Sequence, residues 1–243
     1  MPKTSHSING APAIADAPEH APLRLGARLA EHRNRQGVRV SELARRVGVS
    51  ASLISQIERD QSRPSVSTLF GLAEALGVPV DAFFRDERQS LDDAERIRDA
   101  EPVAPSGDRS SATSEGPGAA GDRHVVRREQ RAAIDIAGGV RWERLTPAAL
   151  DDLEFMELHY APGAESNPTQ YRHPGMEMVL VLDGRLEIAL GFERYELRAG
   201  DSMCFASTTP HRYTNPSDQV TRAVTVILPG DTASGVSRSD RRP

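Results

Sequence analysis

The chain has 243 residues, of which 27% are charged and 38% hydrophobic, and its net charge is −5. This length accommodates two small domains, and the negative charge excludes a protein that coats nucleic acid along its whole surface. No apolar stretch is long enough to span a bilayer or to act as a secretory signal, so we expect a cytoplasmic protein without membrane contact. The single cysteine, Cys204, excludes an internal disulfide and is expected in a buried strand.

Residues 41–59, SELARRVGVSASLISQIER, predict two short helices joined by a tight turn. Gly48 can adopt the positive φ that a sharp turn needs, and Ser50 is a natural N-cap for the second helix. Apolar residues recur at helical spacing on both sides of the turn, at Leu43, Ala44, Val47, Ile54 and Ile57. This pattern is typical of a helix-turn-helix, whose second helix enters the major groove of DNA.

The flanks of this unit complete a small all-α domain over residues 21–85. We expect a helix at 23–36, a break at Pro64, a helix from Ser65 to Gly77, and a last turn carrying Phe83 and Phe84. Five helices in this length bury one small core. The segment contains ten arginines and no lysine against six acids, a charge of +4, which favours localised contact with phosphates.

Residues 23–84 resemble the lambda-repressor-like, or Xre, class of helix-turn-helix domains in four blocks: LGARLAEHRNRQG, SELARRVGVS, LISQIERDQSRPS and LFGLAEALGV. The resemblance implies that the first turn of the recognition helix contacts DNA. Asp60 departs from the glycine common in the class, which leaves the geometry of that turn open. The alternative for this domain is a protein-binding or antitoxin-like module without operator specificity. The expected DNA-binding residues are Ser50, Ala51, Ser52, Ser55, Gln56, Arg59 and Arg63.

Three segments are rich in polar and small residues and have no hydrophobic period. Residues 1–20 are expected to form a disordered arm, residues 86–122 an acidic flexible linker, and residues 230–243 a mobile tail. The linker carries four arginines and ten acids, a charge of −6, so it is repelled by DNA.

Residues 123–229 predict an all-β domain of short strands separated by Gly, Pro, Asn and Asp turns. Many short strands at regular spacing indicate a closed sandwich or barrel. Asp183-Gly184 lies between two apolar runs, MEMVLVL and RLEIAL, and predicts a β-hairpin there.

Two segments of this domain resemble the motifs of the cupin family, a double-stranded β-helix or jelly-roll barrel. In residues 163–184, His173 precedes Glu177 by four positions and six residues separate Glu177 from Gly184. In residues 200–215, His211 and Asn215 fall in the register of the second motif, although Ala206 and Thr208 replace its usual Pro and Gly. The resemblance covers the core of the domain.

The cupin resemblance implies a polar site inside the barrel, formed by Tyr171, His173, Glu177 and His211. Tyr171 stands where metal-binding cupins have their first histidine, and a phenol with a pKa near 10 is a poor ligand for divalent ions. In one hypothesis His173, Glu177 and His211 bind Zn, Mn, Ni or Fe. In a second, all four residues bind an organic effector without metal. In a third, they only satisfy one another.

The whole chain resembles Xre-type regulators with a C-terminal cupin sensor, similar to the putrescine-utilisation repressor group. This resemblance implies a DNA-binding transcriptional regulator, expected to be a repressor and not an enzyme, that binds a roughly palindromic operator as a homodimer. A small-molecule effector in the barrel would then change the disposition of the DNA-binding domains. One alternative is a cupin metalloenzyme, a dioxygenase or isomerase, fused to a DNA-binding domain. Another is a cupin that only dimerises the chain.

Overall fold

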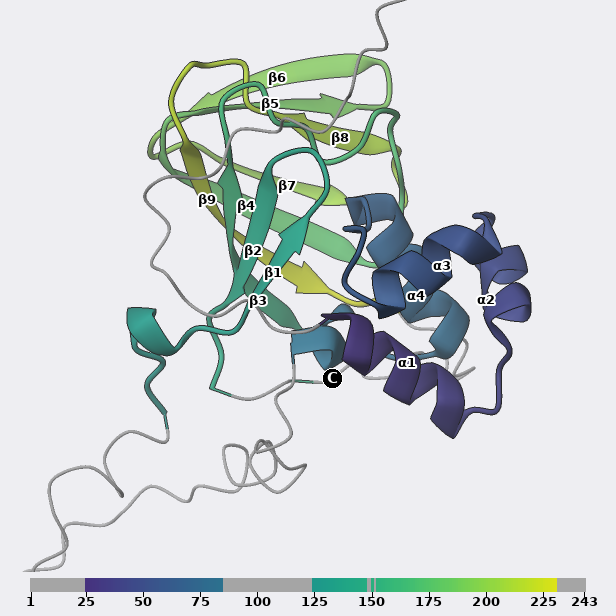
Figure 1. The fold of residues 1–243 in the computed structure, drawn as a ribbon. Coiled ribbons are helices and arrows are strands. Elements are labelled where there is room, and N and C mark those ends of the chain that lie inside the picture. The colour runs from purple at the N-terminus through teal and green to yellow at the C-terminus, as the bar shows by residue number, and fades with distance from the viewer. Residues whose placement is uncertain (1–24, 85–123, 148–149, 151, 231–243) are drawn as a thin grey trace, which may run out of the picture.

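The computed structural model describes residues 25–84, 124–147, 150 and 152–230 of the chain. A helical domain lies against one side of a barrel of nine strands (Figure 1). The expectations for residues 1–20, for the linker at 86–122 and for nearly all of the tail at 230–243 fall outside the described residues. None of the helices in the described part is long and apolar enough to cross a membrane.

The helical domain follows the expected order of elements. It comprises α1 (Leu25–Arg35), α2 (Val40–Val47), α3 (Ala51–Glu58), α4 (Val66–Leu76) and the 3₁₀ turn η1 (Val80–Phe84). Gly48 ends α2 with φ 76°, and the Ser50 hydroxyl caps α3 by accepting the Leu53 N–H. The buried apolar side chains of α2 and α3, Leu43, Ala44, Ile54 and Ile57, belong to the predicted stripes.

Asp60, the departure from the class pattern, does adopt the left-handed conformation that glycine would supply. Its φ is 55°, and it is the one non-glycine residue with positive φ in the described part of the chain. The Asp60 carboxylate accepts the Gly26 N–H at 2.9 Å, in the first turn of α1. A negative charge at a helix N-terminus is favourable, so this bond offsets the cost of the backbone conformation.

The β domain forms two facing antiparallel sheets, which confirms the all-β barrel prediction (Figure 1). One sheet has the order β1-β2-β3-β9-β4-β7 and the other the order β6-β5-β8. A short 3₁₀ turn, η2 (Arg128–Gln130), precedes them. The strands are β1 (Ala133–Ile136), β2 (Val140–Arg144), β3 (Glu154–Tyr160), β4 (Met176–Asp183), β5 (Arg185–Leu190), β6 (Glu193–Arg198), β7 (Ser202–Ala206), β8 (His211–Thr214) and β9 (Thr221–Leu228).

The hairpin predicted at Asp183-Gly184 is wrong. Strand β4 pairs with β7 and β9, whereas β5 pairs with β6 and β8, so the chain passes from one sheet to the other at Gly184. Gly184 has φ 79°, and a Cβ there would lie 2.5 Å from the Thr221 hydroxyl. The glycine therefore serves a close approach at a barrel corner, which a local sequence signal cannot distinguish from a tight turn.

The prediction that Cys204 is buried is wrong, because this side chain lies on the outward side of the six-stranded sheet. Cys204 is exposed on β7, opposite Met178 of β4. The exposed apolar residues nearby are Met176, Leu180 and Leu182 on β4 and Leu228 on β9. Alternation along the strands, rather than residue type, decides which of these side chains enter the barrel.

The helical domain packs directly on the barrel, and the buried apolar residues of both domains form one continuous cluster. The Ala137 N–H donates to the Pro64 carbonyl at 2.9 Å, and the Ser67 hydroxyl donates to the Asn167 side chain at 2.8 Å. At the far end of this interface the Val80 N–H donates to the Glu154 carboxylate at 3.0 Å. The two domains therefore share a defined interface.

Glu154 is a buried acid in this interface, only 8% exposed. Burial and the nearby charge of Asp81 raise the pKa of Glu154 to about 8, although the Val80 N–H acts in the opposite direction. Because the folded pKa lies above the ordinary value of 4.5, the folded state binds this proton more tightly than the unfolded chain.

The stability that Glu154 contributes should therefore be complete below pH 4.5 and be lost as the pH rises through about 8. We expect Glu154→Gln to gain stability relative to the wild type over this range, by at most about 1.4 kcal/mol per pH unit. Urea unfolding at several pH values measures the difference, and Glu74→Gln on the exposed side of α4 controls for loss of one charge. A difference that does not change with pH would contradict the assignment.

Candidate functional site

The predicted base-contacting residues lie together on α3. Ala51, Ser52 and Gln56 are exposed, and Ser55 is half-buried. Ser50 is also exposed, but its hydroxyl is engaged in the cap of α3. The outward face of the first two turns of α3 thus carries small and amide side chains, which are the types that contact base edges in a groove.

The two predicted phosphate-binding arginines differ in their surroundings. Arg59 is exposed just after α3, where its Nε donates to the Gln61 side chain at 3.1 Å. Arg63 instead forms an ion pair of 3.2 Å with Asp135 of the barrel, and its side chain is 63% exposed. The structure therefore gives Arg63 a partner within the chain that sequence reasoning missed.

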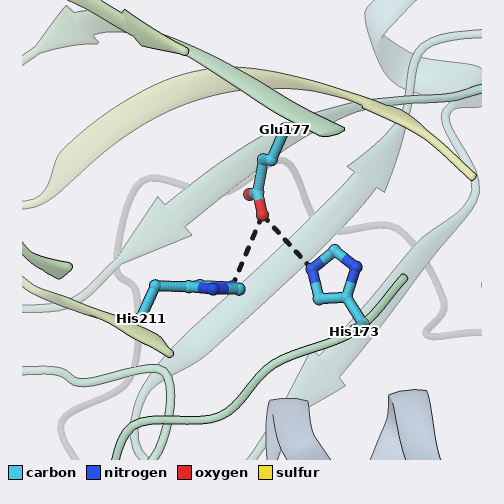
Figure 2. Close-up of side chains that lie close together, drawn as sticks. All are labelled: His173, Glu177 and His211. Carbon is cyan, nitrogen blue, oxygen red and sulfur yellow. Dashed lines mark ion pairs between the residues drawn. The ribbon is translucent and has the colours of Figure 1, made fainter. Parts of the chain in front are cut away.

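The barrel brings together three of the four predicted cupin-site residues around one carboxylate oxygen. His173 comes from the loop before β4, Glu177 from β4 and His211 from the start of β8, and their side chains converge (Figure 2). Oε2 of Glu177 lies 3.3 Å from Nε2 of His173 and 3.6 Å from Nε2 of His211. None of the three residues is more than 7% exposed.

The other nitrogen of each imidazole is held by the backbone. Nδ1 of His173 lies 3.2 Å from the Pro174 carbonyl, and Nδ1 of His211 lies 2.9 Å from the Thr209 carbonyl. A carbonyl only accepts, so each Nδ1 carries the proton and each Nε2 is directed at the carboxylate. Among the described residues, neither Nε2 atom nor Oε2 of Glu177 has a hydrogen-bond partner of good geometry.

The second oxygen of Glu177 is well satisfied. The Tyr213 hydroxyl donates to Oε1 at 2.7 Å and the Thr225 hydroxyl donates at 3.2 Å. Burial raises the pKa of Glu177, but the neighbouring His173 and the Tyr213 hydrogen bond outweigh it, so the net pKa lies below the ordinary range of a glutamate. The carboxylate is thus ionised, and burial lowers the pKa of His211 so that its ring favours the neutral form.

A buried carboxylate oxygen facing two imidazole nitrogens is a set of donors that a divalent cation prefers. The three ligand atoms lie within 4.8 Å of one another, and the 2-His-1-carboxylate set suits Fe, Zn, Mn or Ni. Burial and the charge of Glu177 raise the pKa of Tyr171 well above its ordinary value, so the phenol stays protonated. Tyr171 therefore lines the site as a neutral group, beside the His211 ring at 4.5 Å between centroids.

An aromatic side chain of the helical domain also reaches this site, and sequence reasoning missed it. Phe70 of α4 stacks on the His173 ring, with 4.0 Å between centroids and 7° between planes. Phe70 lies 5.9 Å from the Trp142 ring and 6.1 Å from the Tyr171 ring. Tyr213 was missed as well, although its spacing of two from His211 places both side chains on the same face of β8.

A second buried cluster, Glu143, Glu157 and His159, lies across β2 and β3. Arginines surround its carboxylates, with Arg131 at 2.7 Å from Glu157 and Arg141 at 3.2 Å from Glu143. Burial raises the pKa of Glu143, but His159 and the arginines lower it to about 2. Since guanidinium groups already satisfy these oxygens, this cluster is an internal ion network and not a cation site.

Comparison with protein families identifies both domains. Residues 29–83 match the helix-turn-helix family model, and residues 156–227 match the cupin domain model. The chain therefore contains an Xre-like helix-turn-helix domain followed by a cupin domain.

Two curated proteins are similar over most of the chain. The HTH-type transcriptional regulator SutR of Escherichia coli strain K12 is 27% identical over 80% of this chain and 89% of its own length. The HTH-type transcriptional regulator PuuR of the same organism is 24% identical over 85% of this chain and 96% of its own length. A crystal structure of an HTH_3 family transcriptional regulator from Vibrio cholerae has 19% identity and a TM-score of 0.54, covering 85% of this chain and 95% of that one. This last likeness concerns the fold.

Proposed function

We propose that this helix-turn-helix and cupin protein is a transcriptional regulator, acting as a repressor, that binds a roughly palindromic operator as a homodimer and responds to a small-molecule effector in its barrel. It acts in the cytoplasm and is not itself an enzyme. Similarity to HTH-type transcriptional regulators along most of the chain supports the general function. The exposed first turns of α3 carry the DNA-binding part of the proposal.

The DNA-binding role rests on how α3 is presented. The Ser50 cap fixes the start of the helix, and its buried residues Ile54 and Ile57 hold it on the domain core. Ser52 and Gln56 then face outward, four residues apart on one side of the helix. A glutamine in this position pairs with adenine through two hydrogen bonds, and a serine accepts or donates to either partner.

Replacing Gln56 by alanine should weaken specific binding by roughly five- to 150-fold, because one bidentate base contact contributes about 1–3 kcal/mol. Non-specific binding and its salt dependence should change little, since no phosphate contact is removed. The measurement is a footprinting titration on DNA from the promoter region of the protein's own gene, at several salt concentrations.

The matched control is Gln130→Ala, which removes an exposed glutamine from the cupin domain. An equal loss of affinity in Gln56→Ala and Gln130→Ala would overturn operator recognition by α3. So would a wild type that binds the DNA without protecting a specific site in the footprint. The antitoxin-like alternative predicts the second of these outcomes.

The effector role rests on the unmatched polar atoms around Glu177. The carboxylate and both histidines are buried with atoms that lack hydrogen-bond partners in the described part of the chain, which is costly unless an occupant satisfies them. Tyr171 adds a neutral phenol beside them. This chemistry supports a site for a small polar or cationic effector at Tyr171, His173, Glu177 and His211.

The homodimer rests on the outward face of the six-stranded sheet, where Met176 pairs with Leu228, Met178 with Val226, and Leu180 with Val224. Cross-strand pairing places these apolar residues on one side of the sheet, and several are exposed. A continuous apolar face suits an isologous contact with a second copy, and a palindromic operator requires such two-fold symmetry.

Leu180→Asp should convert the dimer into a monomer, because two carboxylates would be buried near the two-fold axis. Sedimentation velocity over a range of protein concentrations measures the change. Phe192→Asp is the control, since Phe192 is fully exposed at the turn between β5 and β6, away from this sheet. A dimer that survives Leu180→Asp, or a monomeric wild type, would contradict the proposed interface.

A second candidate is a divalent metal at His173, Glu177 and His211, favoured by the convergence of three buried donor atoms. A bound ion would supply Lewis-acid polarisation of an oxygen ligand, while the protein's own Tyr213 and Thr225 hold the carboxylate in place. A stoichiometric redox-active ion would favour the alternative of a cupin metalloenzyme fused to a DNA-binding domain.

Calorimetric titration of the metal-free chain with Zn²⁺ should detect one site, and His211→Ala should lower its affinity by more than about tenfold. His159→Ala, in the arginine-rich cluster of the same sheet domain, should leave the affinity unchanged. No binding to the wild type, or equal effects of the two variants, would exclude the metal and leave two hypotheses, a metal-free effector site and a cluster whose members only satisfy one another.

A further inference from the structure

The cupin site has a wall that the barrel does not supply. Phe70 lies on α4 of the helical domain, yet its ring stacks on His173 at 4.0 Å and forms an aromatic group with Trp142 and Tyr171. His173 belongs to a loop, but it is only 7% exposed. The DNA-binding domain therefore covers the side of the site at which His173 lies.

We propose that docking of the DNA-binding domain closes the cupin site, with Phe70 as the lid, so that an occupant beside His173 and the docked arrangement exclude each other. The closure itself follows from the geometry of this chain; its use in regulation rests on the proposed effector function. An effector that replaces Phe70 on the imidazole face would gain the stacking surface that α4 now covers.

Hydrogen bonds through Ser166 and Tyr213 link α4, the helix that carries Phe70, to the carboxylate of Glu177. The Val66 N–H, in the first turn of α4, donates to the Ser166 carbonyl at 3.3 Å. The Ser166 hydroxyl accepts the Tyr213 N–H at 3.0 Å, and the Tyr213 phenol donates to Glu177 at 2.7 Å. Displacement of α4 therefore acts on the same residues that hold Glu177.

Beside the apolar cluster that the two domains share, polar contacts join α4 and the loop before it to the barrel. Ser67 donates to Asn167 beside the lid, and Arg63 pairs with Asp135 at the partly exposed edge. The Arg63–Asp135 pair is exposed and contributes little stability, so this edge of the interface adds little resistance to opening. The same Arg63 was expected on DNA phosphates, which links docking to the DNA-binding surface.

The lid is tested by the reactivity of imidazoles toward diethyl pyrocarbonate in the full-length protein, followed by peptide mass spectrometry. Phe70→Ala should raise the modification rate of His173 by about tenfold or more, because the rate follows the population in which the ring is accessible. His159 is the internal control, since it is buried on a part of the barrel where it contacts Glu157 and Glu143 and not α4.

A second variant locks the lid instead of removing it. Ser67→Cys with Asn167→Cys, in a Cys204→Ser background, places two thiols where the native side chains are hydrogen-bonded. Oxidation should lower the His173 rate below that of the wild type, and reduction should restore it, while His159 does not change. If neither the lock nor Phe70→Ala alters the His173 rate, the site opens by another route and the proposal is overturned.

This test needs neither effector nor DNA, so its outcome is independent of the proposed function. If the His173 rates change as expected but the protein binds no operator, the closure of the site by Phe70 is supported and only its role in regulation is refuted. Operator binding by a protein in which neither the lock nor Phe70→Ala alters the His173 rate would retain the regulator and refute the lid.

Discussion

The buried carboxylate of Glu177 is the constraint around which the barrel site is organised. Removing an ionised carboxylate from water is costly, so the surrounding elements must supply donors or charge. Strand β8 supplies Tyr213 and His211, β9 supplies Thr225, and the loop before β4 supplies His173. One oxygen is thereby satisfied by hydroxyls, and the other faces two imidazole nitrogens and has no hydrogen-bond partner among the described residues.

The residues that hold the Glu177 carboxylate also contact the helical domain. Tyr213, which donates to Glu177, is bonded through its backbone to Ser166, and Ser166 accepts from the first turn of α4. Phe70 on that helix lies against His173. The HTH domain is thus in contact with the site both through hydrogen bonds and through an aromatic stack. Direct packing of this kind couples the two domains independently of the segment that joins them in the sequence.

The presentation of α3 depends on interactions within the helical domain itself. Gly48 and Ser50 set the turn and the start of α3, and Asp60 replaces the usual glycine by bonding to the Gly26 amide. These interactions span short distances within one small core, so they fix which α3 residues face outward. Arg63 is the exception, because its partner Asp135 belongs to the barrel.

The sequence by itself predicted both domain types, the turn between α2 and α3 and the end of α4, because caps and turn glycines act within a few residues. The cupin resemblance, rather than local physics, pointed to His173, Glu177 and His211 as one cluster. Only the tertiary structure decided where neighbours distant in sequence meet. At Gly184 the chain passes from one sheet to the other instead of forming the expected hairpin. Cys204 is exposed on the outer face of the sheet, and Phe70 of the helical domain lies over the cupin site. The physical reason is that sheet pairing and domain packing depend on contacts over long sequence distances, for which a local pattern carries no signal.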